Sequence, residues 1–333
     1  MKKKIAINGF GRIGRLTYRA LRQHSDVELV AINDLTDTQT LAHLLKYDTA
    51  HRQSDFEVSF GDDFIMAGDQ KILAFAQKDP SHLPWKDLGI DIVLECTGIY
   101  LTADTAGAHL TAGAKKVILS APPKDDSIPT FVFGVNHQLL DAEDKIISNA
   151  SCTTNCLAPI VKFLNETWGL EFANMITIHA YTQDQKLQDA PHKDLRRARA
   201  AAQNVIPTST GANKAVAAVY PPIQGKLFGS SYRVPVITGS LIELFCKLSK
   251  NVDVATVNEA FKKASETSLK GILKYNEDPI VSSDIIGDHH SAIFDAPLTD
   301  GKDGLIKLTA WYDNESGYSN RLADMCTLVA KLI

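Results

Sequence analysis

The sequence is poor in cysteine, with only five cysteines in 333 residues. They form an odd and widely spaced set: Cys96, Cys152, Cys156, Cys246 and Cys326. Such a set argues against the paired disulfide framework that holds many small secreted proteins together. It leaves room instead for a free thiol with a chemical role.

Long apolar runs are also missing, because no stretch approaches the ~18 uninterrupted apolar residues that a membrane-spanning helix needs. The opening sequence MKKK resembles the basic end of a signal peptide, but only three apolar residues separate it from the polar sequence NGFGR. That stretch is too short to serve as the apolar part of a signal peptide. We therefore expect a cytoplasmic protein with no membrane partner.

An excess of positive charge is absent too, since 35 Lys and Arg residues stand against 39 Asp and Glu residues. With a net charge of -4, nucleic acid is not expected as the main partner. The basic sequence RRAR at residues 196–199 lacks interleaved aromatic residues. Local ion pairs or an oligomer contact explain it better than nucleic-acid binding.

The length predicts two domains, because 333 residues exceed the chain length beyond which a single hydrophobic core usually stops growing. In the first half, short apolar strands alternate with helical stretches, which is typical of an α/β fold with a doubly wound, mainly parallel sheet. A helix is expected at residues 12–23. Strands are expected at residues 5–8, 27–33, 92–96, 116–120, 130–135 and 146–148.

The pattern changes near residue 150 and predicts an α+β domain with a mixed, largely antiparallel sheet. A helix is expected to begin near Ser151, and longer strands at residues 175–179, 233–249 and 304–312, with an irregular polar stretch at 182–210. The last helix has apolar residues on one side; these are Tyr318, Leu322, Met325, Val329 and Leu332. The expected domains are a nucleotide-binding domain at 1–150, a catalytic domain at 151–315 and a C-terminal helix at 316–333 that packs back on the first domain.

The sequence GFGRIG at residues 9–14 is a G-x-G-x-x-G motif between an expected strand and an expected helix. Gly9 permits a tight turn, Gly11 lets a pyrophosphate approach the backbone, and Gly14 lets the helix pack on the strand. Asp34 closes the next strand, where it would bind ribose hydroxyls and repel the extra phosphate of NADP. NAD is therefore the expected cofactor; the alternative is a glycine turn with a solvated Asp34.

Cys152 lies in the sequence SNASCTTNC at residues 148–156, between an expected strand and an amphipathic helix. At a helix N-terminus the dipole favours thiolate, so we expect a low thiol pKa and sensitivity to oxidation. The alternative is a small buried cap residue, and Cys156 is better explained as a core residue. His179, at the end of a strand, is a candidate base, although a lone histidine is more often structural.

Asp288, His289 and His290 are consecutive, which is not the spacing of metal ligands on a helix. In a strand, adjacent residues would point to opposite faces. We therefore interpret this sequence as a solvated turn and expect no metal.

Five stretches of the sequence together resemble the glyceraldehyde-3-phosphate dehydrogenase family, of the bacterial, phosphorylating type. They are INGFGRIGR at 7–15, SCTTNCLAP at 151–159, PHKDLRRARAAA at 191–202, PTSTGA at 207–212 and WYDNE at 311–315. The resemblance covers essentially the whole chain, and the cysteine stretch is its most specific marker. It implies a Rossmann nucleotide-binding domain and a homotetramer in which residues 182–204 lie between subunits.

The resemblance also implies a glycolytic reaction: NAD and inorganic phosphate convert glyceraldehyde 3-phosphate to 1,3-bisphosphoglycerate. Cys152 would form a thiohemiacetal and then a thioester, with His179 as the base. Contacts to NAD, beyond the three glycines, would come from Arg12, Ile13, Asp34, Lys78, Ser120, Asn314 and Tyr318. One anion site would use Thr182, Asp184, Arg197 and Arg233, and a second would use Ser151, Thr153, Thr210 and Gly211.

Two positions depart from the common family pattern. Ala190 stands where many NAD-specific members carry leucine, which leaves some use of NADP open, and Ser316 replaces a common tryptophan. Three alternative functions remain open: an erythrose-4-phosphate dehydrogenase that uses water as acyl acceptor, an NADP-preferring anabolic paralogue, and a secondary binding role without catalysis. Asp34 and the sequence TQDQ at 182–185 favour the glyceraldehyde enzyme over the erythrose enzyme.

Overall fold

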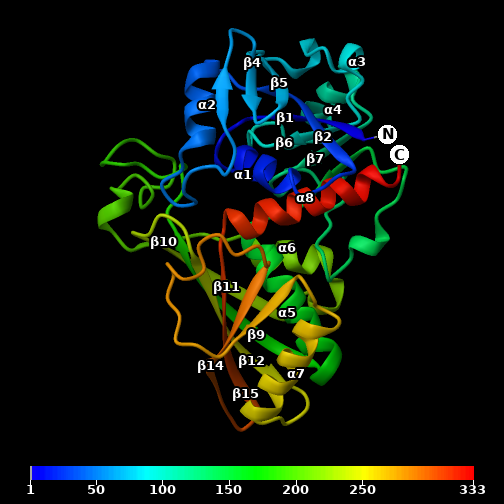
Figure 1. Cartoon of the computed structure of the whole chain (residues 1–333). Coiled ribbons are helices and arrows are strands. Elements are labelled where there is room, and N and C mark those ends of the chain that lie inside the picture. Colours follow the sequence, from blue (N-terminus) through cyan, green and yellow to red (C-terminus); the bar gives the residue numbers. More distant parts are fainter. Residues whose placement is uncertain (1) are drawn as a thin grey trace. The chain divides into compact units, whose positions relative to one another are not determined.

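The computed structural model describes residues Lys2–Ile333, which form two compact units (Figure 1). The first unit contains the chain through Phe131 together with Gln138–Ala150 and Ser319–Ile333. The second unit contains Val132–His137 and Ser151–Tyr318. Each unit has its own β-sheet, and the division near Ala150 separates the two sheets along the chain.

The sheet of the first unit has eight strands in the order β3-β4-β5-β2-β1-β6-β7-β8. Parallel pairing joins the part of the sheet with the order β5-β2-β1-β6-β7-β8. Strands β3 and β4 form an antiparallel edge next to β5. This topology confirms the predicted doubly wound α/β fold. The strands are β1 (Lys3–Asn8), β2 (Val27–Asn33), β3 (Val58–Phe60), β4 (Phe64–Ala67), β5 (Gln70–Phe75), β6 (Ile92–Glu95), β7 (Lys116–Leu119) and β8 (Ile146–Ser148). The helices are α1 (Arg12–Leu21), α2 (Thr38–Lys46), α3 (Trp85–Leu88) and α4 (Ala103–Thr111).

One expected strand of the first half, at residues 130–135, is wrong. Only Thr130 pairs there, in an isolated bridge with Ser148. The chain then turns, since the amide of Val135 donates to the carbonyl of Val132 and Gly134 has a φ of 78°. The apolar sequence FVFGV has the composition of a strand, but its glycine adopts a left-handed conformation that ends extended structure.

The sheet of the second unit has seven strands in the order β10-β11-β9-β12-β15-β14-β13. It is mixed, with parallel pairing at β9–β11 and β13–β14 and antiparallel pairing elsewhere. The strands are β9 (Leu170–Ala180), β10 (Ile206–Thr208), β11 (Leu227–Val234), β12 (Ser240–Leu248), β13 (Leu273–Asn276), β14 (Ala292–Lys302) and β15 (Leu305–Tyr312). The helices are α5 (Cys152–Trp168), α6 (Ala212–Val219) and α7 (Val254–Glu266), and α8 (Ser316–Ala330) follows β15.

The expected single strand at residues 233–249 is two strands, because the chain breaks between β11 and β12. Pro235 has no amide hydrogen to donate to a sheet. Gly239 has a φ of 92°, and a side chain there would collide with the carbonyl oxygen of Ser282. The break therefore places Arg233 at the end of β11 instead of in the middle of a long strand.

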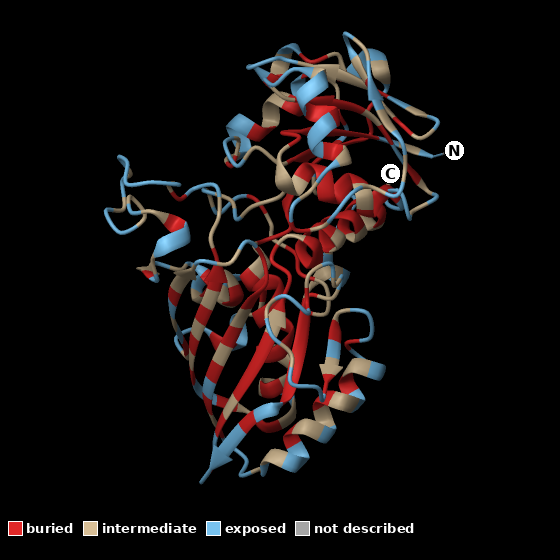
Figure 2. Cartoon of the chain, turned by 60° about the vertical axis from the view of Figure 1, so that its left-hand side comes forward, coloured by how far each residue is buried: buried red, intermediate tan, exposed pale blue. Residues whose placement is uncertain are grey.

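Burial follows the alternation of the strands in the second unit (Figure 2). Along β12, Ile242, Leu244 and Cys246 are buried on the side that packs against α5, while Phe245 is exposed. In α8, Leu322, Met325 and Val329 are buried as expected, but Leu332 lies beyond the end of the helix and is partly exposed. Each sheet thus supplies a rigid layer at whose ends the candidate site residues lie.

Candidate active site

The glycine turn between β1 and α1 has the geometry that the motif predicts. Gly9 has a φ of 88°, and a Cβ atom on Gly14 would lie 2.3 Å from the carbonyl oxygen of Gly9. Gly11 caps α1 without a side-chain hydrogen bond, and no heavy atom lies within 4 Å of the place where its Cβ would be. The first amides of α1 are therefore not covered by a capping side chain, which suits the approach of a pyrophosphate to backbone amides.

Asp34 follows the end of β2, and its carboxylate is fixed by backbone amides. One oxygen accepts from the amide of Phe10 at 2.8 Å, and the other accepts from the amide of Thr36 at 3.1 Å. The carboxylate thereby stands beside the glycine turn, where a ribose would lie next to a bound pyrophosphate. The bare helix start and the fixed carboxylate both fit a dinucleotide.

The other expected cofactor residues of the first unit lie at different depths. Arg12 donates to Asp48 at 2.6 Å, so its guanidinium is anchored at the start of α1. Ser120 follows β7, and its amide bonds the carbonyl of Glu95 at the end of β6. Ile13 is half-buried, whereas the side chain of Lys78 is exposed.

Cys152 is the first residue of α5, and Ser151 caps that helix by accepting a hydrogen bond from the amide of Thr154. The Sγ atom of Cys152 lies 3.4 Å from Nε2 of His179. His179 reaches this place from the end of β9. The fold thus brings together a thiol and an imidazole that are 27 residues apart in the sequence.

Two neighbours of Nδ1 bear on the tautomer of His179. Its Nδ1 lies 2.7 Å from the carbonyl oxygen of Ala180, which can only accept, and against Nη1 of Arg233, which can only donate. When Nδ1 donates to the Ala180 carbonyl, the lone pair of Nε2 faces Cys152. Burial and the nearby charge of Arg233 lower the pKa of His179 to about 3, so the imidazole is neutral at physiological pH.

The thiol of Cys152 does not have the low pKa that its place at a helix start predicts. Burial raises the pKa of the Cys152 thiol, and the opposing effects of Arg233 and Thr153 do not cancel that increase. The residue is half-buried, and its Sγ lies beside Nε2 of His179. The pair is therefore a neutral thiol beside a neutral imidazole.

Arg233 brings positive charge to this pair. Its Nη1 atom lies against Nδ1 of His179 and donates to the carbonyl of Ala180 at 3.2 Å. Burial lowers the pKa of Arg233, and its Nε is buried without an acceptor. A buried guanidinium with an unpaired Nε donor near the thiol is suited to binding an anion.

The other residues of the first expected anion site lie in the segment between β9 and β10. Arg197 donates to Asp184 at 2.6 Å and to the hydroxyl of Thr208 at 2.7 Å. The charges of both Arg197 and Asp184 act on Arg233. Thr182 holds this segment through its amide, which donates to Gln185 at 3.2 Å. Arg197 is thus engaged within the protein, while Arg233 keeps an unpaired donor.

The second expected anion site involves the starts of two helices that contact each other, α5 and α6. Gly211 caps α6 with no side chain, and the Thr210 hydroxyl accepts from the amide of Ala212 at 3.2 Å. The hydroxyls of Ser151 and Thr153 are already bonded, to Thr154 and Tyr312 respectively. The backbone at the start of α6 is therefore the more open part of this set.

Tyr312 is a site residue that sequence reasoning missed, because it was named only as part of a family marker. Its hydroxyl bonds those of Thr153 at 3.0 Å and Thr177 at 2.9 Å, and its ring meets His179 edge to face. Burial raises the pKa of Tyr312, so its proton stays in place. The alternation of β15 could have identified it as inward-facing, but not as a neighbour of His179.

Asn314 and Tyr318, which complete the expected cofactor set, are buried at the end of β15 and the start of α8. The Oδ1 atom of Asn314 accepts from the Ser240 hydroxyl at 2.8 Å and the Gly239 amide at 3.2 Å. These contacts fix the orientation of the amide group. Ser316, where the family commonly has tryptophan, begins α8 with its amide bonded to Asp313.

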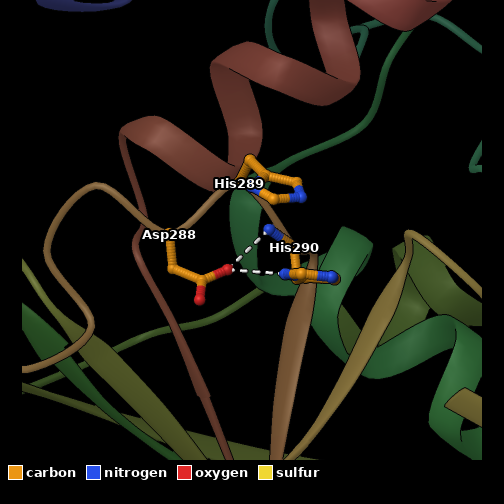
Figure 3. Close-up of side chains that lie close together, drawn as sticks. All are labelled: Asp288, His289 and His290. Carbon is orange, nitrogen blue, oxygen red and sulfur yellow. Dashed lines mark hydrogen bonds and ion pairs between the residues drawn. The ribbon is translucent and has the colours of Figure 1, made fainter.

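Asp288, His289 and His290 gather more closely than expected, with ligand atoms within 4.8 Å of one another (Figure 3). The segment is an irregular turn, as expected, but the two rings lie together with centroids 4.2 Å apart instead of pointing to opposite faces. Both carboxylate oxygens of Asp288 are engaged, one by His290 at 2.8 Å and the other by Lys274 at 3.0 Å. These contacts are those of a turn stabilised by hydrogen bonds and by the ion pair between Lys274 and Asp288.

Comparison with known proteins adds independent evidence. Residues 3–103 match the family described as "Glyceraldehyde 3-phosphate dehydrogenase, NAD binding domain", and residues 151–314 match its "C-terminal domain". No helix between Lys2 and Ile333 is long and apolar enough to cross a membrane.

The chain is also similar over nearly its full length to curated proteins. It is 56% identical to glyceraldehyde-3-phosphate dehydrogenase of Mycolicibacterium smegmatis and to that of Mycobacterium tuberculosis H37Rv, with 99% of each chain covered. It is 54% identical to glyceraldehyde-3-phosphate dehydrogenase 1 of Bacillus cereus, with 97% of each chain covered. The chain therefore belongs to the glyceraldehyde-3-phosphate dehydrogenase family and is an NAD-dependent oxidoreductase.

Proposed function

We propose that this enzyme oxidises glyceraldehyde 3-phosphate to 1,3-bisphosphoglycerate with inorganic phosphate, through a thioester on Cys152. The observation that carries the proposal is the 3.4 Å approach of the Cys152 thiol to Nε2 of His179. A thiol beside an oriented, neutral imidazole is an activated nucleophile. The carbonyl of Ala180 supplies the orientation by fixing Nδ1.

NAD, when bound, supplies the hydride acceptor for the oxidation. The residues proposed to hold it are the glycines of the turn, Arg12, Ile13, Asp34, Lys78, Ser120, Asn314 and Tyr318. The bare start of α1 and the fixed Asp34 carboxylate support this assignment in the first unit. The carboxylate also supports a preference for NAD over NADP, since it would repel a ribose phosphate.

The first chemical step is attack of the Cys152 sulfur on the aldehyde carbon. His179 takes the thiol proton as the carbon–sulfur bond forms, and it returns a proton to the carbonyl oxygen to give a thiohemiacetal. A neutral imidazole is required for this role, and the low pKa of His179 keeps it neutral. The backbone amides at the start of α5 are available to the developing oxyanion.

In the second step His179 removes the hydroxyl proton of the thiohemiacetal as that carbon loses its hydride. A thioester with Cys152 remains, and an oxygen of inorganic phosphate attacks its carbonyl carbon. The carbon–sulfur bond then breaks, the acyl phosphate leaves, and the protonated His179 returns its proton to the sulfur to restore the thiol. Two anion sites are needed, because one substrate carries a phosphate and the other is a phosphate. We assign them to Thr182, Asp184, Arg197 and Arg233, and to Ser151, Thr153, Thr210 and Gly211.

We further propose a homotetramer that works in glycolysis in the cytoplasm. Phe172, Phe228 and Phe245 are exposed on neighbouring strands of the second unit, on the sheet face away from α5. Leu187 and Leu195 are more than four-fifths exposed in the segment between β9 and β10. Exposed apolar groups at this density are typical of surfaces that bind another protein.

NADH formation with and without inorganic phosphate tests the reaction. The comparison includes Cys152→Ser and, as a matched control, Cys246→Ser, which changes a buried cysteine in β12. We expect sustained turnover of the native enzyme only with phosphate, none in Cys152→Ser, and turnover close to native in Cys246→Ser. Sustained turnover without phosphate would contradict the proposal and indicate hydrolysis of the acyl group. Turnover with NADP alone would contradict the assigned cofactor preference.

A further inference from the structure

A fully buried carboxylate lies at the end of β6, outside the proposed catalytic pair. Glu95 has no exposed surface, yet four donors surround it. One oxygen accepts from Nδ2 of Asn8 at 2.6 Å and from Nε2 of His109 at 3.1 Å. The other accepts from the amide of Thr97 at 2.7 Å and from the Thr97 hydroxyl. A carboxylate has about four lone-pair sites, so every site of Glu95 is used.

The tautomer of His109 follows from its second neighbour. The indole Nε1 of Trp85 donates to Nδ1 of His109 at 3.1 Å. An indole nitrogen can only donate, so Nδ1 carries no proton and Nε2 donates its proton to Glu95. The His109 ring is also fully buried. Glu95 is therefore an acceptor for all of its neighbours, and it cannot be exchanged for a group that donates.

Glu95 also sets the direction of a chain of side-chain amides. Because Nδ2 of Asn8 donates to Glu95, its Oδ1 faces Asn33 and accepts from that amide at 2.7 Å. The Oδ1 of Asn33 in turn accepts from the backbone amide of Gln77 at 2.8 Å. This relay, defined as Glu95, Asn8 and Asn33, joins the carboxyl ends of β6, β1 and β2.

The relay ends next to the residues that contact the dinucleotide. Asn8 immediately precedes Gly9, and Asn33 immediately precedes Asp34. Thr97, held by Glu95, packs so closely on the turn that a Cβ atom on Gly9 would lie 2.8 Å from the Thr97 amide nitrogen. The three strand ends that form the floor of the cofactor site are thus tied to one buried acceptor.

We propose that Glu95, with His109 as its support, is a positioning residue that preorganises the glycine turn and Asp34 for the adenosine half of NAD. Fixing the receptor before binding lowers the entropic cost of association. The relay keeps the backbone of the turn and the Asp34 carboxylate in place while their outward sides stay open. The inference rests on NAD as the cofactor and does not depend on the thioester chemistry, because it is tested by binding without substrate.

The test is calorimetric titration of Glu95→Gln with NAD and with ADP-ribose, which lacks the nicotinamide. In glutamine an NH₂ group replaces one of the two carboxylate oxygens. That NH₂ group would face the two donors that now bond the replaced oxygen, and a donor cannot bond a donor. We expect both dissociation constants to rise about tenfold or more. At saturating NAD, kcat and the KM for the aldehyde should stay within about twofold of native, because the relay does not touch the reacting atoms.

Asp91→Asn is the matched control, because Asp91 precedes the same strand β6 at its opposite end. Its carboxylate accepts from the Lys4 amide at 2.8 Å and from Lys115 at 2.7 Å. We expect this variant to lose thermal stability and to bind NAD and ADP-ribose with native affinity. Native affinity in Glu95→Gln, or equal weakening in both variants, would show that the network serves stability alone and would overturn the proposal.

A second pair of variants keeps the inference testable if Glu95→Gln does not fold. His109→Leu removes both polar contacts of the ring, whereas His109→Gln offers one acceptor to Trp85 and one donor to Glu95. We expect about threefold or greater weakening of NAD and ADP-ribose binding in His109→Leu, and recovery of most of it in His109→Gln. Equal affinities in these two variants would overturn the proposal.

Discussion

Burial acts on the two members of the proposed catalytic pair in opposite directions. It raises the pKa of the Cys152 thiol and lowers the pKa of His179 to about 3. Both effects favour the uncharged form, so the resting pair is a thiol beside a neutral imidazole. Attack by sulfur then requires that His179 take the proton, which gives the imidazole a role beyond orientation.

Substitution of His179 by asparagine tests that role. We expect kcat in His179→Asn to fall by about 10²–10⁴-fold, the usual contribution of a positioned general base. Alkylation of Cys152 by iodoacetamide at pH 7 should slow as well, because the acceptor of the thiol proton is gone. His137→Asn, a half-buried histidine of the same unit, is the control. Native alkylation rates in His179→Asn would show that the thiol ionises without help.

Asp34 is the residue on which the proposed preference for NAD over NADP depends. In Asp34→Asn the side-chain oxygen can still accept from the Phe10 amide, so the change removes charge and keeps the shape. We expect the ratio of kcat/KM for NADP to that for NAD to rise about tenfold, since repulsion of the ribose phosphate is lost. Asp37→Asn, at the nearby cap of α2, should leave the ratio unchanged. An unchanged ratio in Asp34→Asn would assign selectivity elsewhere.

Among the elements, the turn between β1 and α1 tolerates substitution least. A methyl group on Gly14 would meet the Gly9 carbonyl oxygen at 2.3 Å, and that oxygen belongs to backbone that cannot move freely. We expect Gly14→Ala to lose roughly 1–3 kcal/mol of unfolding free energy, as overpacked sites do, together with NAD affinity. Chemical denaturation and calorimetry would measure the two effects.

Gly107→Ala provides the contrast within a helix of the same unit. Gly107 lies in α4 with no heavy atom within 4 Å of its would-be Cβ. Alanine should stabilise this helix by roughly 0.5–1 kcal/mol and leave NAD binding unchanged. A neutral effect of Gly14→Ala on both measurements would contradict the close packing of helix and strand.

Elements with a strong local pattern could be predicted from the sequence, and elements defined by distant contacts could not. The strands at 27–33 and 146–148 match β2 and β8, because their apolar runs are bounded by polar residues. The strand expected at 130–135 and the long strand at 233–249 fail at Gly134 and Gly239, where a positive φ interrupts an apolar sequence. Composition alone does not show that these glycines use their conformational freedom.

The same distinction applies to the candidate site. The position of Cys152 at a helix start could be predicted because a strand, a polar cap and an amphipathic helix follow one another along the chain. Its distance to His179 depends on the packing of α5 against β9. The role of Glu95 could not be predicted from the sequence for the same reason. Its four donors come from residues that are far apart in the chain, between Asn8 and His109.

At the scale of the whole molecule, one face of the sheet in the second unit carries exposed aromatic side chains. Helix α5 packs against β9, β12 and β15, while the aromatic rings of Phe172 and Phe228 are exposed and lie 5.4 Å apart. Phe228 on β11 and Phe245 on β12 lie on either side of Asn174 on β9, the strand between them. Exposed aromatic side chains such as these are what a subunit interface would bury.

Light scattering coupled to gel filtration tests the proposed tetramer. We expect the native protein to elute with four times its chain mass of 36.4 kDa and Phe228→Glu to form smaller species. A buried, unpaired carboxylate at an interface is costly, which is the reason for the expected dissociation. Phe60→Glu, on the exposed edge strand β3 of the first unit, serves as the control. A native protein that elutes as a monomer would contradict the proposed assembly.

The most direct test of the central claim is rapid mixing of the enzyme with NAD and glyceraldehyde 3-phosphate in the absence of phosphate. Absorbance would follow NADH, and peptide mass mapping of the quenched protein would locate the acyl group. The account predicts a burst of about one NADH per subunit and an acyl adduct on Cys152, followed by sustained turnover when phosphate is added. Sustained turnover with no adduct on Cys152 would contradict the thioester mechanism.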